Sequence, residues 1–207
     1  MPRAPSGSVS TTLLGIGVAA VGAQSALTGL AAADSDYRPW PPDEVSGRFG
    51  LYWLLVMGMA MPFFALLATT VGSLYPVGVA SVAGGVVFLT GAAVNVLAAD
   101  EFEGPEEILG LEWRVHTEGP FSFSRNPEVL GHAGALLGLA VAAGSWQALL
   151  LGTAVAGWFA LKPHAEEPVL AERYAEEYAH YRSRVARYLD VGGILGRCPP
   201  ETADCPN

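Results

Sequence analysis

The chain has 207 residues, of which 51% are hydrophobic and only 15% are charged. An ordinary soluble domain carries about 25% charged residues, so this composition argues against one and favours a membrane protein. The 20 Asp and Glu outnumber the 11 Lys and Arg, which gives a formal net charge of −9. Such an acidic chain repels nucleic acid and offers no polybasic patch for anionic lipid, so we expect no nucleic-acid partner.

Three long stretches contain no Asp, Glu, Lys or Arg, namely residues 4–33, 49–99 and 129–161. About 20 helical residues cross a bilayer, so the first stretch fits one helix and the second fits two, divided at a turn over 72–76. The third fits two short helices with a break at 143–145. The sequence predicts an all-α, polytopic membrane protein with about five transmembrane helices in a single membrane domain, 1–207. The expected helices are about 11–33, 50–72, 77–99, 128–143 and 146–161.

The first helix has an alternative interpretation as a cleaved signal peptide, because Arg3 precedes it. The apolar region of a signal peptide is only about 7–15 residues long, whereas this run is long enough to span, so we favour a retained helix. Five crossings leave nearly all Lys and Arg on one side, which the positive-inside rule makes cytoplasmic. We expect an integral protein of the cell membrane, with its N-terminus outside and its loop 100–127 and C-terminus in the cytoplasm.

An amphipathic cap helix is expected at about 167–190, on the cytoplasmic side of the last span. Six apolar or aromatic residues recur there at steps of four and three, which places them on one helix face: Leu170, Tyr174, Tyr178, Tyr181, Val185 and Tyr188. A stripe of this kind more often packs against protein than contacts a cofactor. Residues 192–207 are expected to form a flexible tail, in which the role of Cys198 and Cys205 is open.

Polar residues stand at both edges of the third uncharged stretch. Asn126, Pro127 and Glu128 suit the cap, first position and first turn of a helix. Arg125 has no place in that interpretation and is a candidate anion ligand, with ordinary snorkelling to lipid headgroups as the alternative. At the other edge, Glu166 and Glu167 precede Pro168, where acids also favour a helix start.

The two edges together carry a resemblance to a known family. The first edge supplies Gly119, Pro120, Phe121, Arg125, Asn126, Pro127 and Gly131, and the second supplies Glu166, Glu167, Leu170, Tyr174, Tyr178, Tyr181, Val185 and Arg187. In this order, about residues 80–190 resemble the isoprenylcysteine carboxyl methyltransferase and phospholipid methyltransferase family of integral-membrane enzymes. Three positions depart from the family pattern: Val129 replaces a Tyr, Ala175 a Gly and Ala186 a Pro.

The resemblance implies an S-adenosyl-L-methionine-dependent methyltransferase acting on a lipidic or prenylated acceptor at the cytoplasmic membrane face. It implies Arg125 and Glu167 as catalytic residues. The implied cofactor-binding residues are Glu166, Glu167, Tyr178, Tyr181, Asn126 and Pro127. Carboxylates would meet the cationic groups of the cofactor and the arginine its carboxylate, while tyrosines would wall the adenosine.

Several alternatives stay open. The acceptor could be a prenylcysteine carboxylate, a phospholipid amine or a small isoprenoid, and Glu128 and Val129 bear on whether activity is retained. A membrane reductase of related architecture and a non-catalytic protein that keeps the fold are the other two functions considered. Methyl transfer needs no metal, and no metal site is expected because the four histidines show no ligand spacing with the cysteines. His132 is expected to be packed or hydrogen-bonded rather than a base, and the oligomeric state is open.

Overall fold

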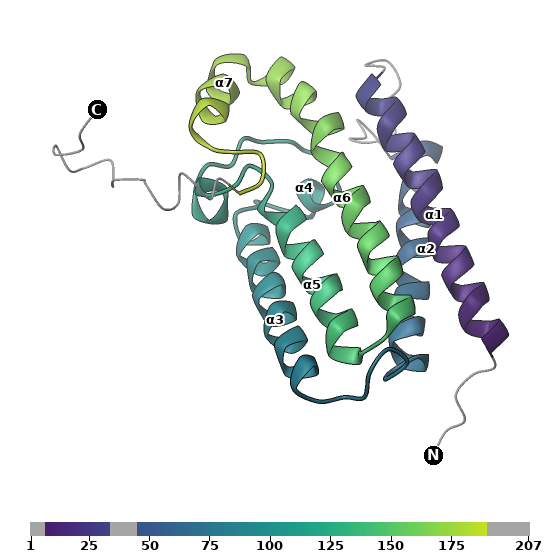
Figure 1. The fold of residues 1–207 in the computed structure, drawn as a ribbon. Coiled ribbons are helices and arrows are strands. Elements are labelled where there is room, and N and C mark those ends of the chain that lie inside the picture. Colours follow the sequence, from purple (N-terminus) through teal and green to yellow (C-terminus); the bar gives the residue numbers. More distant parts are fainter. Residues whose placement is uncertain (1–6, 34–44, 190–207) are drawn as a thin grey trace, which may run out of the picture.

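The computed structural model describes residues 7–33 and 45–189, and its regular elements in those ranges are all helices (Figure 1). In chain order they are α1 (Gly7–Ala33), α2 (Gly47–Thr69), α3 (Val79–Ala99), α4 (Pro105–Ile108), the 3₁₀ turn η1 (Gly119–Ser122), α5 (Pro127–Ala143), α6 (Trp146–Arg173) and α7 (Ala175–Arg184). The predicted all-α, polytopic membrane architecture is confirmed.

Three helices are long and apolar enough to cross a membrane. They are α1, α2 and α3, with 27, 23 and 21 residues and mean hydropathies of 1.6, 2.0 and 1.9. The fourth expected span is the shorter apolar helix α5, and the fifth is the apolar first half of α6. On α2 and α3, large side chains such as Leu54, Met61, Val82 and Leu89 are exposed. We interpret these outer faces as lipid-facing, because burial against lipid would remove them from water.

The predicted separation between a fifth span at 146–161 and a cap helix at 167–190 is wrong. A single helix, α6, runs through Pro163 and Pro168 to Arg173, and a much shorter helix, α7, follows. Each proline removes one helical hydrogen bond. The helix start was predicted near Pro168 because Glu166 and Glu167 precede it and acids favour the first turn of a helix. The helix α6 continues past Pro163, and the side chains of Lys162 and Glu166, on either side of this proline, form an ion pair. The tail 192–207 lies outside the described residues.

The helices α3 and α5 pack with their backbones in close approach. A Cβ atom added at Gly84 or Gly91 of α3 would overlap backbone atoms of α5, and one added at Gly138 of α5 would overlap α3. Small residues permit this approach and are typical of helix pairs in membranes. The pair forms one side of the bundle, with α6 beside α5 and with α1 and α2 beyond it (Figure 1).

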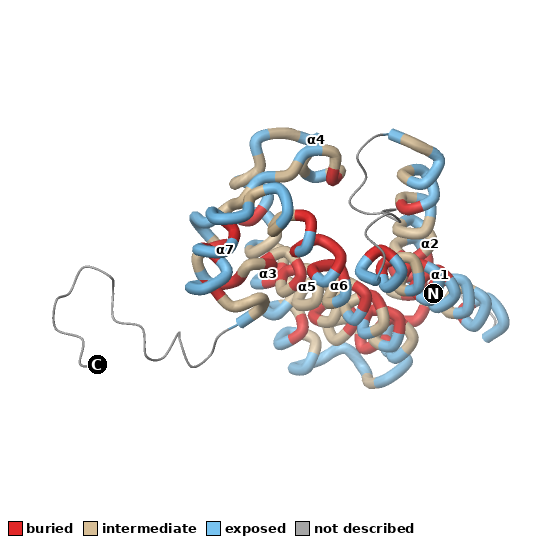
Figure 2. Tube along the Cα trace, turned by 90° about the horizontal axis from the view of Figure 1, so that it is seen from above, coloured by how far each residue is buried: buried red, intermediate tan, exposed pale blue. Residues whose placement is uncertain are grey.

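The hairpin of α5 and α6 returns the chain to the side from which it came. Gly144, with φ of +59°, ends α5, and Ser145 caps α6 by accepting a hydrogen bond from the Ala148 amide at 3.1 Å. This is the break predicted at 143–145. Viewed from above, buried positions gather towards the centre and exposed positions face outward (Figure 2). The hairpin therefore places the start of α5 and the later part of α6 at one end of the bundle.

Candidate functional site

A hydrogen-bonded turn holds Arg125 just before α5. The backbone reverses at Gly119, which has φ of +51°, and passes through η1. The Arg125 amide donates to the Ala186 carbonyl at 2.9 Å, and its Nη1 donates to the carbonyls of Arg182 and Val185 at 3.2 and 3.1 Å. The end of α7 and the residues that follow it therefore fix both the backbone and the side chain of Arg125.

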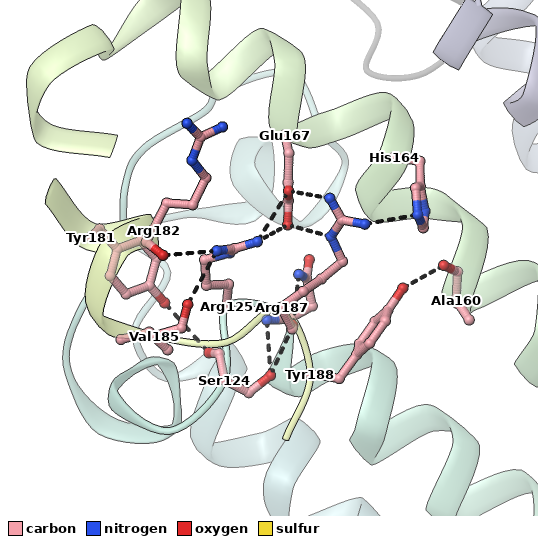
Figure 3. A network of polar contacts seen from close by, with 11 residues as sticks. Ser124, Arg125, Ala160, His164, Glu167, Tyr181, Arg182, Val185, Arg187 and Tyr188 are labelled. Carbon is pink, nitrogen blue, oxygen red and sulfur yellow. Dashed lines mark hydrogen bonds and ion pairs between the residues drawn. The ribbon is translucent and has the colours of Figure 1, made fainter. Parts of the chain in front are cut away.

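Glu167 joins two arginines, and we call Arg125, Glu167 and Arg187 the arginine clamp (Figure 3). Nη2 of Arg125 donates to the two carboxylate oxygens of Glu167 at 3.0 and 3.2 Å. From Arg187, Nε and Nη2 donate to the same oxygens at 3.0 and 2.8 Å. The side chains of Arg125 and Glu167 are only 9% and 10% exposed. Planar, charge-assisted contacts of this kind fix geometry as well as charge, and the clamp has a formal net charge of +1.

The arginines also control the ionisation of Glu167. Burial alone would raise the pKa of this carboxyl, but the hydrogen bonds from Arg187 and Arg125, together with their positive charges, lower its pKa below the ordinary value of 4.5. The same contacts raise the pKa of Arg187. Glu167 and Arg187 are therefore charged at neutral pH.

A second ionic cluster lies one turn back along α6, and we call Lys162, Glu128 and Glu166 the lysine triad. Lys162 Nζ is 3.3 Å from Glu166 Oε1 and 3.5 Å from Glu128 Oε1. The side chains of Lys162 and Glu166 are 9% and 8% exposed. Lys162 also lies 5.7 Å from the ring centroid of Phe159. The triad connects α5 to α6 and has a formal net charge of −1, opposite in sign to the clamp.

A cavity of about 430 Å³ adjoins both clusters. Arg125 of the clamp lines it, as do all three residues of the triad. Its aromatic lining comes from Tyr52, Trp53, Phe102, Trp113, Phe121, Trp158 and Phe159. These residues belong to α2, α6 and the loop after α3, so the cavity joins the membrane helices to the loop that covers them. Its size and its mixture of aromatic and charged groups are those of a small-molecule site.

The acidic loop after α3 forms the cover of this cavity. The Glu107 side chain, 4% exposed, receives a hydrogen bond from the Glu103 amide at 2.7 Å and lies 3.2 Å from His116 Nε2. Tyr174, between α6 and α7, donates its hydroxyl hydrogen to the Trp113 carbonyl. Glu107, Trp113 and His116 all line the cavity. At least one acid of this loop, Glu107, therefore has a structural role, because its contacts hold the covering loop in place.

The predicted site residues divide into two groups. Arg125, Asn126 and Glu166 line the cavity. Asn126 has the predicted cap position but makes no side-chain cap bond, and its Nδ2 instead donates to the Arg187 carbonyl at 3.1 Å. Glu167 and Pro127 are buried beside the cavity without lining it. Glu167 therefore acts on the cavity through Arg125.

The two predicted tyrosines do not line the cavity either. Tyr178 and Tyr181 are 2% and 3% exposed and pack with Ala98, Phe121 and Val185 in a separate apolar cluster. The Tyr181 hydroxyl donates to the Phe121 carbonyl at 2.7 Å. Burial raises the pKa of Tyr178 to about 12 and that of Tyr181 further, so both hydroxyls stay protonated at neutral pH. Both side chains pack in this cluster, as an aromatic stripe at helical spacing ordinarily predicts, and their role towards the cofactor stays a prediction.

Lys162 and Arg187 were not among the predicted site residues. Lys162 is the single lysine of the chain and ends the third uncharged stretch, four residues before Glu166. That i, i+4 spacing is a signal for an ion pair along a helix, provided that the helix continues past residue 161. Arg187 matched the family pattern, but nothing in its spacing indicated that it shares Glu167 with Arg125. Within residues 7–33 and 45–189, no three His, Cys, Asp or Glu side chains are grouped to hold a metal ion.

Comparison with known proteins gives one result. No curated protein and no solved structure matched the chain. A family model described as phospholipid methyltransferase matches residues 74–177, just over half of the chain. The match runs from the turn before α3 into α7, and it includes Arg125 and both Glu166 and Glu167. With its all-helical membrane architecture, the chain belongs to the phospholipid methyltransferase family of membrane methyltransferases.

Proposed function

We propose that this protein is an S-adenosyl-L-methionine-dependent methyltransferase that acts on a lipidic or prenylated acceptor at the cytoplasmic membrane face. The observation that carries the proposal is the meeting of two oppositely charged clusters at one aromatic-lined cavity. The arginine clamp contributes a cation through Arg125, and the lysine triad contributes carboxylates through Glu166 and Glu128. A ligand with both an anionic and a cationic end is complementary to this arrangement.

The residues present fit such a cofactor. Arg125 Nε is a buried donor that has no hydrogen-bond partner among the described residues, although the two terminal nitrogens of the same guanidinium are bonded. A buried N–H without a partner is uncommon and costs about 1–3 kcal/mol, so a ligand carboxylate at this position would relieve that cost. Aromatic side chains such as Trp113 and Phe121 offer faces for a purine ring.

Each cluster has a distinct role in this proposal. Arg125, Asn126 and Glu166 would contact the cofactor, and Glu167 with Arg187 would hold Arg125 in place. Pro127, Tyr178 and Tyr181 would support this arrangement from the layer behind. The bound cofactor supplies a methyl group on a sulfonium that is already a good leaving group. The protein has then chiefly to position the acceptor in line and to exclude water, and no metal is required.

The acceptor is proposed to enter from the bilayer. Tyr52, Asn95, His132 and Trp158 all line the cavity, and they come from the membrane helices α2, α3, α5 and α6. The cover formed by the loop after α3 would separate the cavity from the cytoplasm. We propose that the N-terminus lies outside and the C-terminus in the cytoplasm, which puts the cover on the side where the cofactor is available.

Calorimetric titration of the detergent-purified protein with S-adenosylhomocysteine and, separately, with NADPH tests this function. We expect S-adenosylhomocysteine to bind in a 1:1 complex and NADPH not to bind. Binding of NADPH alone would instead support the membrane reductase. Binding of neither ligand would support a non-catalytic protein that keeps the fold.

A further inference from the structure

His164 lies on α6, three residues before Glu167 and next to the arginine clamp (Figure 3). Its Nε2 is 2.8 Å from Nη1 of Arg187. Guanidinium nitrogens donate hydrogen bonds and do not accept them, so Nε2 of His164 must be the acceptor. The ring is therefore neutral in this contact, with its lone pair on Nε2 and its hydrogen on Nδ1.

This contact engages the third nitrogen of the Arg187 guanidinium. Nε and Nη2 of Arg187 donate to Glu167, and Nη1 donates to His164. Glu167 in turn accepts from Nη2 of Arg125, which lines the cavity. A continuous series of hydrogen bonds therefore runs from His164 to the cavity. Because a guanidinium is planar and rigid, a movement of Arg187 at its His164 edge also changes its geometry at Glu167.

The exposed end of this series is the end that can take up a proton. His164 is exposed, whereas Glu167 is buried. Histidine ordinarily changes charge between about pH 5 and 8. In that range Glu167 stays ionised because the two arginines lower its pKa, and Arg187 stays charged because Glu167 raises its pKa. A fall in pH from about 8 to 5 therefore acts on the series through His164.

The charged group in contact with His164 is a cation. Among the described residues that contact is made by Arg187, while Glu167 is bound to two arginines and Glu166 to Lys162. From the segment after α7, Tyr188 also reaches α6, and its hydroxyl donates to the Ala160 carbonyl at 2.6 Å. The helices packed on α6 contain these titratable residues: none in α1, Arg48 and Tyr52 in α2, Glu128 and His132 in α5, and Glu176, Glu177, Tyr178, His180, Tyr181, Arg182 and Arg184 in α7. A proton on Nε2 would set two donors of like charge against each other, which is unfavourable.

We propose that His164 is a positioning residue that makes the arginine clamp sensitive to protons, so that cofactor affinity falls when its ring becomes charged. The inference rests on the proposed methyltransferase function. The neutral ring accepts from Arg187 and holds this guanidinium against Glu167, which holds Arg125 at the cavity. The charged ring repels Arg187 and offers it no lone pair. The hydrogen bonds from Arg187 to Glu167 then weaken, and Arg125 loses part of its support.

Calorimetric titration of S-adenosylhomocysteine into the detergent-purified wild type and into His164→Gln, at about pH 8 and at about pH 5.5, tests the inference. The glutamine amide oxygen can still accept from Arg187 but does not titrate. We expect matching affinities at the higher pH. At the lower pH the wild type should bind about fivefold more weakly than the variant, equivalent to about 1 kcal/mol, the repulsion between two unit charges about 4 Å apart in water.

The matched control is His180→Gln, which removes another exposed histidine, on α7. It should follow the wild type at both pH values. His116 lines the cavity beside Glu107 and is present in all three proteins, so any pH dependence that it causes cancels in the comparison. The pH dependence that His164→Gln abolishes is then the part that passes through the arginine clamp.

Side-chain nitrogen signals of ¹⁵N-labelled histidine read the ring directly, with His164→Gln identifying the His164 signal. At about pH 8 we expect a neutral ring that carries its hydrogen on Nδ1. A neutral ring that carries it on Nε2 would overturn the inference, and this result does not depend on any ligand. Equal pH dependence of affinity in the wild type and His164→Gln would also overturn it and leave the proposed function standing. Failure of S-adenosylhomocysteine to bind all three proteins at both pH values would instead refute the proposed function, and with it the role of His164 in cofactor affinity.

Discussion

Arg125, just before α5, and Glu167, on α6, are 42 residues apart in the chain and joined by two hydrogen bonds of 3.0 and 3.2 Å. The uncharged hairpin between them carries the chain away and back, and backbone carbonyls at the C-terminal end of α7 also accept hydrogen bonds from the arginine. Arg187 donates two further hydrogen bonds to the same carboxylate. The relationship explains how two polar edges of one apolar stretch become one site.

Replacing Glu167 with Gln should lower both stability and cofactor affinity. Two guanidinium groups would lose their shared counter-charge, at a cost of about 1–3 kcal/mol in unfolding free energy. Arg125 would also be freed from its fixed position. Thermal unfolding in detergent and calorimetric titration with S-adenosylhomocysteine measure the two effects.

Glu176→Gln is the matched control, because Glu176 is an exposed acid in the first turn of α7. Its loss should cost about 0.3–1 kcal/mol at most and leave affinity unchanged. Equal behaviour of the two variants would contradict the role given to the arginine clamp.

The arginine clamp also predicts how stability depends on pH. The pKa of Glu167 is lower in the folded protein than its ordinary value of 4.5, so the carboxylate contributes stability that is fully present above about that pH. This contribution should be lost as the pH falls further, through the lowered pKa. Thermal midpoints measured from pH 7 downward should therefore fall more steeply below pH 4.5 for the wild type than for Glu167→Gln. Parallel curves would show that the clamp contributes nothing to the acid response.

Tyr181→Phe and Tyr178→Phe should differ, although the two tyrosines are neighbours in one cluster. The Tyr181 hydroxyl donates to the Phe121 carbonyl, whereas the buried Tyr178 hydroxyl has no partner among the described residues. Removing the first should destabilise the protein by about 1–3 kcal/mol, and removing the second should be neutral or slightly stabilising. Thermal unfolding of both variants decides this, and the reverse order would mean that the hydroxyl contacts are misassigned.

Gly84→Ala and Gly85→Ala form a second matched pair, this time on α3. A methyl group at Gly84 would meet the backbone of α5, while one at Gly85 has no atom within 4 Å. We expect Gly84→Ala to lose most of its folded yield in detergent. Gly85→Ala should be tolerated and could gain up to about 0.5–1 kcal/mol from helix propensity. Comparable yields would contradict the close packing of α3 against α5.

A reporter fused after Asn207 tests the topology. The asymmetry of Lys and Arg predicts a cytoplasmic location for it, and an external location for a reporter placed before Met1. An external C-terminus would separate the cover of the cavity from a cytoplasmic cofactor and contradict the proposed arrangement of the site.

The sequence predicted the parts of this protein that depend on local composition. Uncharged runs located the helices, and the break at 143–145 follows from Gly144, which adopts the left-handed conformation. The extent of α6 could not be predicted, because Pro163 and Pro168 each weaken a helix locally. The contacts that accompany its continuation are between side chains: Lys162 pairs with Glu166 one turn away, and Glu167 pairs with Arg125 from before α5.

The candidate site was predicted only as far as the motifs reach. Arg125 and Glu167 do meet, but the motif could not show that Arg187 shares the carboxylate. The lysine triad forms because α5 and α6 lie side by side, and the packing of these two helices could not be predicted from the local sequence. Tyr178 and Tyr181 were assigned to the cofactor from the family pattern, although their helical spacing already indicated packing.

Calorimetric titration of S-adenosylhomocysteine into Arg125→Gln, with Arg184→Gln as the control, tests whether Arg125 binds the cofactor in this cavity. Arg125 has a buried Nε without a partner at the edge of the cavity, whereas Arg184 is exposed on α7. We expect wild-type affinity for Arg184→Gln and at least a tenfold loss for Arg125→Gln, equivalent to about 1.4 kcal/mol. Unchanged affinity in a folded Arg125→Gln protein would contradict the placement of the cofactor in this cavity.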